Sequence, residues 1–589
     1  MNEKNQFTML KLENLNVTYN TRPAVRALQD VDLALAPKDT LGIIGESGCG
    51  KTTLALSIMG LIRNADISGR ITFRKQVLTD MRESTLRRIR WRKIAMAFQN
   101  SLEVLNPVIR LGEQIAEPMY AHFKLSAREA DQRVAELLEL TGLEASWRHC
   151  YPHQLSGGMR QKALVAMALS CDPEVLIVDE PFSSLDAESR HAMVHLFQEL
   201  QERMGFAMIL ISHSLPAIQQ LTSRMITLYS GSVIEAGRTA DMLRNPLHPY
   251  SRGLINAAPE FFQYKDLWGI AGEPPVAGSI DGCPFYPRCV QRDGPCKASR
   301  PRLQHVGIER MVACHKGGIE TVLTARGVIK TFKLENQTIT ALDGVDILIR
   351  RGEVVSLVGA SGSGKSTLAH ILVNVLASDT GEVQFAGRRV TGHEATARMG
   401  GMQIVFQDPS EAVSPRLKVL DAVREPLDIM GWADRPNRDR KAVNALSAVH
   451  LPATPDFLHR SCHALSGGQR QRLAVARAMA TDPALLIADE ITAMLDPSTQ
   501  ATLLRELKGL QHTRGFSMLF ITHDMHLARK VADRVYVLDH GAIVEHGAAF
   551  DVFDHPRSRH THRLLDAAFD HDRSIARATD RNISGWEKS

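Results

Sequence analysis

Short apolar runs recur along the chain, and most end at a glycine or an acidic residue. Runs of roughly four to eight such residues are typical of strands buried on both faces of a sheet. Leu41–Ile44, Val175–Val178 and Ala207–Leu210 are such runs in the first half, and Val354–Val358 and Leu485–Ala488 are such runs in the second. Because helical patterns lie between these runs, the alternation predicts a layered α/β core with much parallel sheet.

The whole pattern occurs twice. Matched features of the two halves are separated by nearly the same number of residues, between 308 and 314. This self-similarity predicts two copies of one domain, at residues 1–240 and 321–550. Residues 241–320, which carry prolines and cysteines, have no equally developed counterpart after the second copy. There, residues 551–589 hold only a short remnant of that segment and a charged tail. The matched positions are Lys51 and Lys365, Gln99 and Gln407, Ser156 and Ser466, Glu180 and Glu490, and His213 and His523.

Length and composition agree with several ordinary globular domains. A chain of 589 residues is too long for one core, and its 44% hydrophobic and 23% charged residues are average proportions. The net charge of +5 is small for this length, so it requires no nucleic-acid partner. No stretch approaches the roughly 18 apolar residues that span a membrane, and the polar N-terminus is not a signal peptide. We therefore expect a cytosolic protein.

A glycine-rich segment follows an apolar run in each copy and fits the pattern G-x-x-x-x-G-K-[ST]. Its glycines let backbone N–H groups surround phosphate oxygens, and the helix that starts there adds its positive end. Lys51 and Lys365 are expected to hold phosphate charge, and the hydroxyls of Thr52 and Ser366 to contact Mg²⁺. The nucleotide-binding positions are Gly45, Ser47, Gly48, Cys49, Gly50, Lys51, Thr52 and Thr53, and in the second copy Gly359, Ser361, Gly362, Ser363, Gly364, Lys365, Ser366 and Thr367.

Two adjacent carboxylates end a later apolar run of each copy, Asp179 with Glu180 and Asp489 with Glu490. The carboxyl ends of central parallel strands are where ligands collect in such sheets. We expect each aspartate to bind Mg²⁺ through water. The neighbouring glutamate is expected to polarise the attacking water as general base.

Two further side chains of each copy are expected at the same edge. Gln99 and Gln407 follow apolar runs and can reach Mg²⁺ or the attacking water. His213 and His523 end later apolar runs and can hydrogen-bond a γ-phosphate. A lone histidine is usually structural, but its repetition in both copies favours the functional interpretation.

Each copy also carries a serine and two glycines at the start of a long helical stretch, which is an anion site. Since each copy already has one phosphate site, this second one is expected to serve a nucleotide held by the other copy. An aromatic residue near the start of each copy, Tyr19 or Phe332, is the candidate platform for adenine. The serine–glycine positions are Ser156, Gly157 and Gly158, and Ser466, Gly467 and Gly468.

The order of phosphate loop, glutamine, Leu-Ser-Gly-Gly, aspartate–glutamate and histidine resembles that of an ATP-binding cassette (ABC) ATPase over nearly all of both copies. The resemblance implies two tandem P-loop ATPase domains, with Mg²⁺ and two ATPs in a head-to-tail sandwich. One ATP would lie between Lys51 and Ser466, and the other between Lys365 and Ser156. Ile491 stands where the first copy has Pro181, a departure that leaves both carboxylates in place.

The segment between the copies contains four cysteines in 32 residues, spaced C-x5-C-x6-C-x17-C. Four thiolates in a cytosolic chain suggest a metal centre, and the chemistry alone allows Zn²⁺, an iron–sulfur cluster or free thiols. Residues 245–259 resemble the C-terminal extension of oligopeptide- and nickel-type importer ATPases. Resemblance to the dipeptide-importer subunit with this cysteine pattern implies a [4Fe–4S] cluster. The ligands would be Cys283, Cys289, Cys296 and Cys314.

The resemblance as a whole implies a fused pair of ATPase subunits of a peptide, nickel or metallophore importer. Such a chain would lie on the cytoplasmic face of the inner membrane against two separate permease subunits. A solute-binding protein outside the cytoplasm would deliver the solute, and no nucleic acid is expected. The alternatives are a soluble tandem cassette protein that acts on ribosomes or nucleic acid, and a scaffold of a phosphonate-degrading complex.

Overall fold

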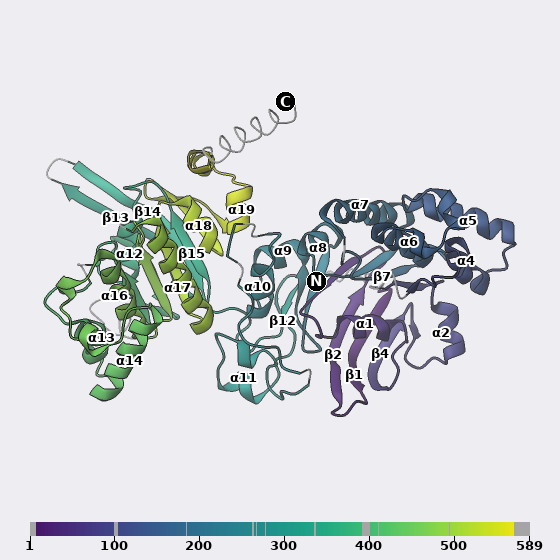
Figure 1. Ribbon diagram of the computed structural model, residues 1–589, viewed down its shortest axis with the longest axis horizontal. Helices are drawn as coiled ribbons and strands as arrows, with labels where there is room; N and C mark the ends of the chain where they lie inside the picture. The colour runs from purple at the N-terminus through teal and green to yellow at the C-terminus, as the bar shows by residue number, and fades with distance from the viewer. Residues whose placement is uncertain are drawn as a thin grey trace. The chain divides into compact units, whose positions relative to one another are not determined.

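The computed structural model describes residues 8–98, 104–183, 185–261, 264–266, 268–276, 278–334, 337–390, 401–409, 412–493 and 495–569. It consists of two compact units, Met1–Glu260 with Gly272–Gly318, and Phe261–Ala271 with Ile319–Ser589. Figure 1 shows strands and helices layered against one another within each unit. No helix in the described residues is long and apolar enough to cross a membrane.

The central sheet of the first unit confirms the predicted parallel strands. Five strands run parallel in the order β9-β3-β8-β7-β6, and β10, β12 and β11 continue the sheet in antiparallel fashion beyond β9. Every residue of β3, β7 and β8 is buried, which is why these strands read as continuous apolar runs. The strands are β3 (Thr40–Ile44), β6 (Ile94–Ala97), β7 (Val175–Asp179), β8 (Ala207–Ile211), β9 (Arg224–Tyr229), β10 (Ser232–Arg238), β11 (Gln304–Gly307) and β12 (Arg310–Val312).

A second, antiparallel sheet covers this core, in the order β2-β1-β4-β5. Its inward residues, such as Leu10 and Leu28, share one hydrophobic cluster with Ile43 of β3 and Leu54 of α1. Because β1 ends at Tyr19, this packing carries Tyr19 to the start of α1. The strands are β1 (Leu10–Tyr19), β2 (Val25–Leu35), β4 (Ala65–Phe73) and β5 (Gln76–Val77).

The helices of the first unit follow the strands of the central sheet. Helix α6 begins at the Leu-Ser-Gly-Gly motif because the Ser156 side chain accepts a hydrogen bond from the backbone of Met159 as N-cap. The helices are α1 (Lys51–Ile58), α2 (Glu83–Ile89), α4 (Leu111–His122), α5 (Ala127–Leu140), α6 (Gly157–Leu169), α7 (Ala187–Met204), α8 (Leu215–Leu221), α9 (Thr239–Arg244), α10 (Pro249–Asn256) and α11 (Gly294–Ala298).

The second unit repeats this plan. Its central sheet has the order β18-β19-β20-β15-β21-β22, parallel except for the last pair, and its antiparallel sheet has the order β14-β13-β16-β17. The strands are β13 (Thr321–Leu334), β14 (Gln337–Arg350), β15 (Val354–Val358), β16 (Thr380–Phe385), β17 (Arg388–Arg389), β18 (Met402–Val405), β19 (Leu485–Asp489), β20 (Ser517–Thr522), β21 (Arg534–Asp539) and β22 (Ala542–Ala548). The helices are α12 (Lys365–Leu372), α13 (Val419–Ile429), α14 (Arg435–Ala448), α15 (Pro455–Leu458), α16 (Gly467–Met479), α17 (Pro497–Arg514), α18 (Met525–Val531) and α19 (Ala549–Asp554).

The segment between the two copies is divided between the units. Most of it continues the first unit, where β12 pairs with β10 and Arg310 forms an ion pair with the fully buried Glu235. Residues Phe261–Ala271 instead belong to the second unit. There the Lys265 ammonium forms a buried ion pair with Asp533, and Trp268 stacks near His512 of α17.

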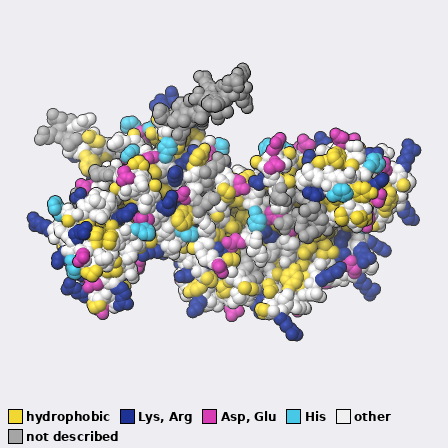
Figure 2. All heavy atoms as spheres, viewed as in Figure 1, with side chains coloured by type: hydrophobic (Ala, Val, Ile, Leu, Met, Phe, Trp, Pro, Cys, Tyr) yellow, Lys and Arg dark blue, Asp and Glu magenta, His cyan; other side chains and the backbone are white. Residues whose placement is uncertain are grey.

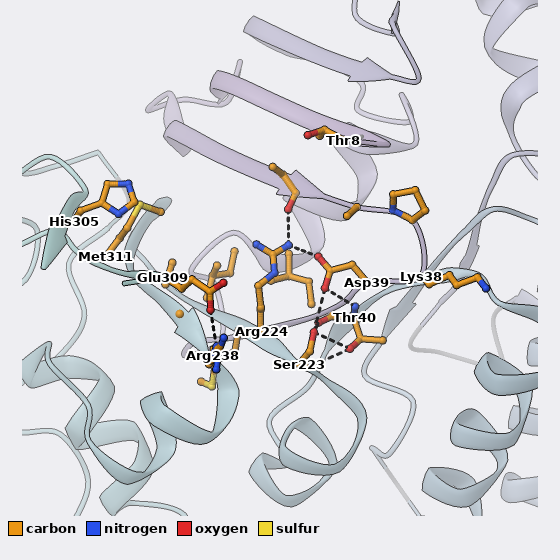
Figure 3. Close-up of a pocket in the computed structure, with 18 residues that line it drawn as sticks. Thr8, Lys38, Asp39, Thr40, Ser223, Arg224, Arg238, His305, Glu309 and Met311 are labelled. Atoms are coloured by element: carbon orange, nitrogen blue, oxygen red, sulfur yellow. Dashed lines mark hydrogen bonds and ion pairs between the residues drawn. The ribbon is translucent and has the colours of Figure 1, made fainter. Parts of the chain in front are cut away.

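The first unit differs at the position that matches Asp533, which is Ser223. In place of a buried ion pair, Ser223 lines an open pocket of about 810 Å³. Figure 3 shows its hydroxyl bonded to Asp39 and Thr40 beside the Arg224–Asp39 ion pair. The two copies therefore share a fold while differing in what covers this end of the sheet. On the face shown in Figure 2, acidic and basic side chains are interspersed.

Replacing Lys265 by alanine is expected to loosen residues 264–271 and the adjoining helices of the second unit. Burial raises the pKa of Asp533, but the charges of Lys265 and Lys508 outweigh this effect and hold the pKa well below its usual range. Removing Lys265 takes the larger of these two attractions from a buried carboxylate, a change that costs about 3 kcal/mol. Native-state hydrogen exchange should show this loss of local opening free energy, and Asp266→Ala, at an exposed neighbouring residue, should show none.

Candidate active site

The phosphate loop of the first unit connects β3 to α1. Gly45 and Gly50 have φ angles of 155° and 109° and lie against backbone, since a Cβ atom at Gly45 would stand 2.3 Å from the carbonyl oxygen of Leu228. Only glycine combines a positive φ angle with so close an approach to neighbouring backbone. The ammonium group of Lys51 is buried and donates hydrogen bonds to the carbonyl oxygens of Gly45 (2.7 Å) and Glu46 (3.1 Å).

Thr52 and Asp179 form a pair suited to a divalent cation. The Thr52 hydroxyl donates a hydrogen bond of 2.9 Å to Asp179 Oδ2 at the end of β7. Burial raises the pKa of Asp179. Within the described residues, the other carboxylate oxygen of Asp179, Oδ1, is buried without a hydrogen-bond partner. Mg²⁺ prefers hydroxyl, carboxylate and water oxygens, so this pair fits a magnesium site.

Glu180 follows Asp179 in a left-handed backbone conformation, with φ of 49°. Its carboxylate lies 3.2 Å from Nε2 of His213 and accepts a hydrogen bond of 3.3 Å from the backbone N–H of His213. Burial raises the pKa of Glu180 to about 7, against the opposing effects of that hydrogen bond and the Lys51 charge. A carboxyl group with a pKa near the working pH is suited to general base catalysis.

These side chains share one pocket of about 360 Å³. The Tyr19 hydroxyl lies 3.3 Å from the hydroxyl of Thr53 at the pocket. Among the described residues that line the pocket, none comes from Ser156–Gly158. The sequence-predicted residues that it brings together are Tyr19, Ser47, Gly48, Gly50, Lys51, Thr52, Thr53, Asp179, Glu180 and His213.

The second unit assembles the matching set. Lys365 is buried and donates hydrogen bonds to the carbonyl oxygens of Gly359 (3.0 Å) and Ala360 (2.9 Å), and it lies 3.7 Å from the Glu490 carboxylate. Burial raises the pKa of Asp489, against a hydrogen bond from Ser366. As in the first unit, Oδ1 of Asp489 is buried without a hydrogen-bond partner in the described part of the chain.

Gln407 and His523 both lie beside Glu490 in this unit. Gln407 Nε2 donates a hydrogen bond of 3.3 Å to Glu490 Oε2, and His523 Nδ1 lies 3.4 Å from Oε1. Phe332 of β13 is partly exposed, with Lys330 over its ring. Gln99, the predicted counterpart of Gln407, lies outside the described residues.

Ser156 and Ser466, the serines of the two Leu-Ser-Gly-Gly signature motifs, cap helices and leave the helix ends open. Ser466 accepts a hydrogen bond from the Gln469 backbone, and the Gln469 side chain accepts one from the Ser466 backbone, so α16 starts with a complete capping box. Ser156 caps α6 with its hydroxyl. A Cβ atom at Gly157 or Gly467 would meet no atom within 4 Å. Both helix starts are therefore accessible to an anion.

The four predicted metal ligands are neighbours, but the prediction of a cluster finds no support. The charges of the other three cysteines act on the pKa of Cys289, which burial raises to about 12, and burial raises the pKa of Cys283 to about 11. Within the described residues, which include all four cysteines, no group of three or more His, Cys, Asp or Glu side chains is placed to hold a metal ion. Their side chains, as arranged, do not fit a metal centre.

Two residues at the first phosphate loop escaped the sequence analysis. The Tyr250 hydroxyl accepts a hydrogen bond of 2.7 Å from the backbone N–H of Glu46. The Arg288 guanidinium contacts both carboxylate oxygens of Glu46, at 2.7 and 3.0 Å. Both residues lie more than 200 positions further along the chain, so no local pattern links them to the loop. The only hint in the sequence was that both residues fall in the segment 241–320, which has no equally developed counterpart after the second copy.

Comparison with known proteins agrees with this geometry. The family described as "ABC transporter" matches residues 28–183 and 342–493, which is more than half of the chain. The chain belongs to the ABC transporter family. It is an ABC ATPase with two cassettes in one polypeptide. The family described as "Oligopeptide/dipeptide transporter, C-terminal region" matches residues 234–296, the segment that follows the first cassette.

Curated relatives match this ABC protein over nearly its whole length. The "Oligopeptide transport ATP-binding protein OppD" of Mycobacterium tuberculosis is 31% identical and covers 95% of this chain and 98% of its own. The "Glutathione import ATP-binding protein GsiA" of Escherichia coli K12 is 33% identical and covers 95% of this chain and 89% of its own. A solved structure of the ATP-binding cassette MJ0796 bound to ADP and Pi is 32% identical, with a TM-score of 0.36, and covers 38% of this chain and 98% of that one.

Proposed function

We propose that this ABC protein hydrolyses ATP at two sites and thereby energises an importer of peptides or peptide-like solutes. The observation that carries the proposal is the twofold assembly of lysine, aspartate, glutamate and histidine around a phosphate loop. The names of the two full-length relatives, an oligopeptide transport protein and a glutathione import protein, favour peptides over nickel or metallophores.

The chemistry follows from the placement of the side chains. Lys51 would exchange its two carbonyl partners for phosphate oxygens on ATP binding, and Thr52 and Asp179 would hold Mg²⁺, which would neutralise developing phosphate charge. Glu180 accepts the proton of the attacking water, and His213 holds the γ-phosphate beside it. Lys365, Ser366, Asp489, Glu490 and His523 take the same roles in the second cassette, with Gln99 and Gln407 near the water or Mg²⁺.

Each ATP is proposed to need both cassettes. The pocket around Lys51 draws none of its described lining from the first signature, Ser156–Gly158. The helix starts at Gly157 and Gly467 are open, as an anion site requires. We therefore propose that Ser466, Gly467 and Gly468 complete the site at Lys51, that Ser156, Gly157 and Gly158 complete the site at Lys365, and that Tyr19 and Phe332 stack on adenine.

The proposed partners are two permease subunits, with a solute-binding protein acting through them from outside the cytoplasm. The protein would then lie on the cytoplasmic face of the inner membrane. The docking region is the helical part between the glutamine and the signature, where α4 and α13 carry the matched pairs Glu117–Pro118 and Glu425–Pro426. The domain limits 1–240, 241–320, 321–550 and 551–589 stay predictions.

Glu180→Gln and Glu490→Gln are expected to trap ATP with little turnover. Glutamine keeps the size of the side chain but cannot accept the proton, so the loss should lie in kcat, by about a hundredfold or more for the double variant. Steady-state ATPase assays with nucleotide-retention measurements test this. Full turnover in the double variant would refute the role of both glutamates as bases.

Co-purification decides between an importer and the alternative functions. Full-length protein from its native membrane is expected to carry two integral membrane proteins and to return to the soluble fraction when they are removed. Ribosomal RNA or a lyase complex in place of the permeases would instead support the soluble alternatives. The ATPase activity expected above is common to all three and does not distinguish them.

The metal content of the cysteine segment is a separate proposal. The proposed [4Fe–4S] cluster, bound by Cys283, Cys289, Cys296 and Cys314, rests on the cysteine spacing alone. Its binding would require these side chains to rearrange and to lose their protons. Protein purified without oxygen should be brown and contain iron and acid-labile sulfide. Colourless protein with zinc, or with no metal, would refute the cluster.

A further inference from the structure

Glu46, the second residue of the first phosphate loop, is held from three sides. Its carbonyl oxygen accepts a hydrogen bond from Lys51 within the loop. Its backbone N–H donates to the Tyr250 hydroxyl at 2.7 Å, and its carboxylate receives two hydrogen bonds from the Arg288 guanidinium. Two of the three partners therefore come from the segment that follows the first cassette.

Both of these partners are rigidly placed. Tyr250 is fully buried on α10, whose start is fixed where the backbone N–H groups of Leu247 and His248 donate to the buried carboxylate of Glu235. The Arg288 side chain is 2% exposed, and its guanidinium lies over the ring of Tyr229. Bidentate arginine–carboxylate pairs fix geometry as well as supplying attraction. The loop is thus braced by side chains that cannot readily move.

Tyr250 and Arg288 form a brace for the phosphate loop, and this brace is continuous with the cysteine segment. Arg288 lies between Cys283 and Cys289, and Phe285 of the same turn packs edge-on against the rings of both Tyr229 and Tyr250. The backbone N–H of Cys283 donates to the carbonyl oxygen of Cys296. A change in the conformation of this turn would therefore move the guanidinium that holds Glu46.

The second cassette offers an internal comparison, because its matched positions carry different side chains. Ala360 replaces Glu46, so the second loop has no carboxylate to be held. Asp539 and His560 replace Tyr229 and Tyr250, and Nδ1 of His560 lies 3.0 Å from the carboxylate of Asp539. The loop of the second cassette thus folds without the brace, and the brace has a role specific to the first site.

We propose that Arg288 and Tyr250 are positioning residues of the first ATP site, which hold the phosphate loop in its nucleotide-binding shape through Glu46. A loop whose N–H groups are already oriented binds phosphate without a further ordering cost. Arg288 also neutralises and draws aside the Glu46 carboxylate, which would otherwise repel the phosphates. The segment after the first cassette thereby sets the nucleotide affinity of the first site and leaves the second unchanged.

The test measures equilibrium binding of a fluorescent ATP analogue with Mg²⁺ to the full-length chain. Lys365→Ala removes binding at the second site, so that the first is observed alone. In that background we expect Arg288→Met to weaken binding about tenfold, the size expected when a charge-assisted pair is lost. In a Glu46→Ala background the same substitution should change affinity less than twofold. Tyr250→Phe, which loses only the hydroxyl, should weaken binding by a few-fold.

The matched control uses Lys51→Ala, which leaves only the second site. There, Arg288→Met and Tyr250→Phe should not change the affinity. Equal weakening by Arg288→Met with and without Glu46, or equal weakening of both sites, would overturn the proposal, since Arg288 would then act through the fold in general.

Two conservative variants keep the proposal testable if Arg288→Met fails to fold. Arg288→Lys and Glu46→Asp preserve both charges but break the bidentate geometry, and each should weaken ATP binding at the first site severalfold and leave the affinity of the second site unchanged. Unchanged affinity in both would overturn the proposal. It depends on ATP binding at the first site, and an absence of binding by the Lys365→Ala protein with Arg288 intact would show that the proposed function itself, rather than the brace, is wrong.

Discussion

Each cassette is built around a buried lysine ammonium group that must be satisfied without water. Burying an unpaired charge is costly, so the phosphate loop wraps around its own lysine and offers it two carbonyl oxygens, in the first unit those of Gly45 and Glu46. The same arrangement recurs at Lys365. A phosphate oxygen carries a negative charge that a carbonyl oxygen lacks, so the phosphates of a nucleotide are suited to replace these contacts. Much else in each unit positions this turn.

The parallel sheet sets where the reactive groups meet. β3 leads into the loop, β7 ends at Asp179 and β8 ends just before His213, and their parallel pairing brings all three carboxyl ends to one edge. Burial at that edge raises the pKa values of Asp179 and Glu180. In the part of the chain that the structure describes, the Oδ1 atoms of Asp179 and Asp489 are buried without a hydrogen-bond partner, which suits both carboxylates to a cation.

The segment between the cassettes makes the two copies unequal. Arg288 and Tyr250 brace the first phosphate loop at Glu46, whereas Lys265 places its charge in the second unit against Asp533. At each of these places the other copy has a different residue, Ala360 for Glu46 and Ser223 for Asp533. Although the side chains proposed to be catalytic are duplicated, the contacts that support them are not.

The sequence by itself determined the repeat, the parallel core and most of the residues proposed for each ATP site. These follow from local patterns, since the loop motif, a buried strand ending in Asp179 and Glu180, and a serine N-cap at Ser156 each lie in a few consecutive residues. Only the tertiary structure decided that residues 304–312 extend the first sheet, that Phe261–Ala271 joins the second unit, and that Tyr250 and Arg288 hold Glu46. Those contacts join positions more than 60 residues apart, and their energy depends on burial and exact approach, which no local pattern of residues encodes.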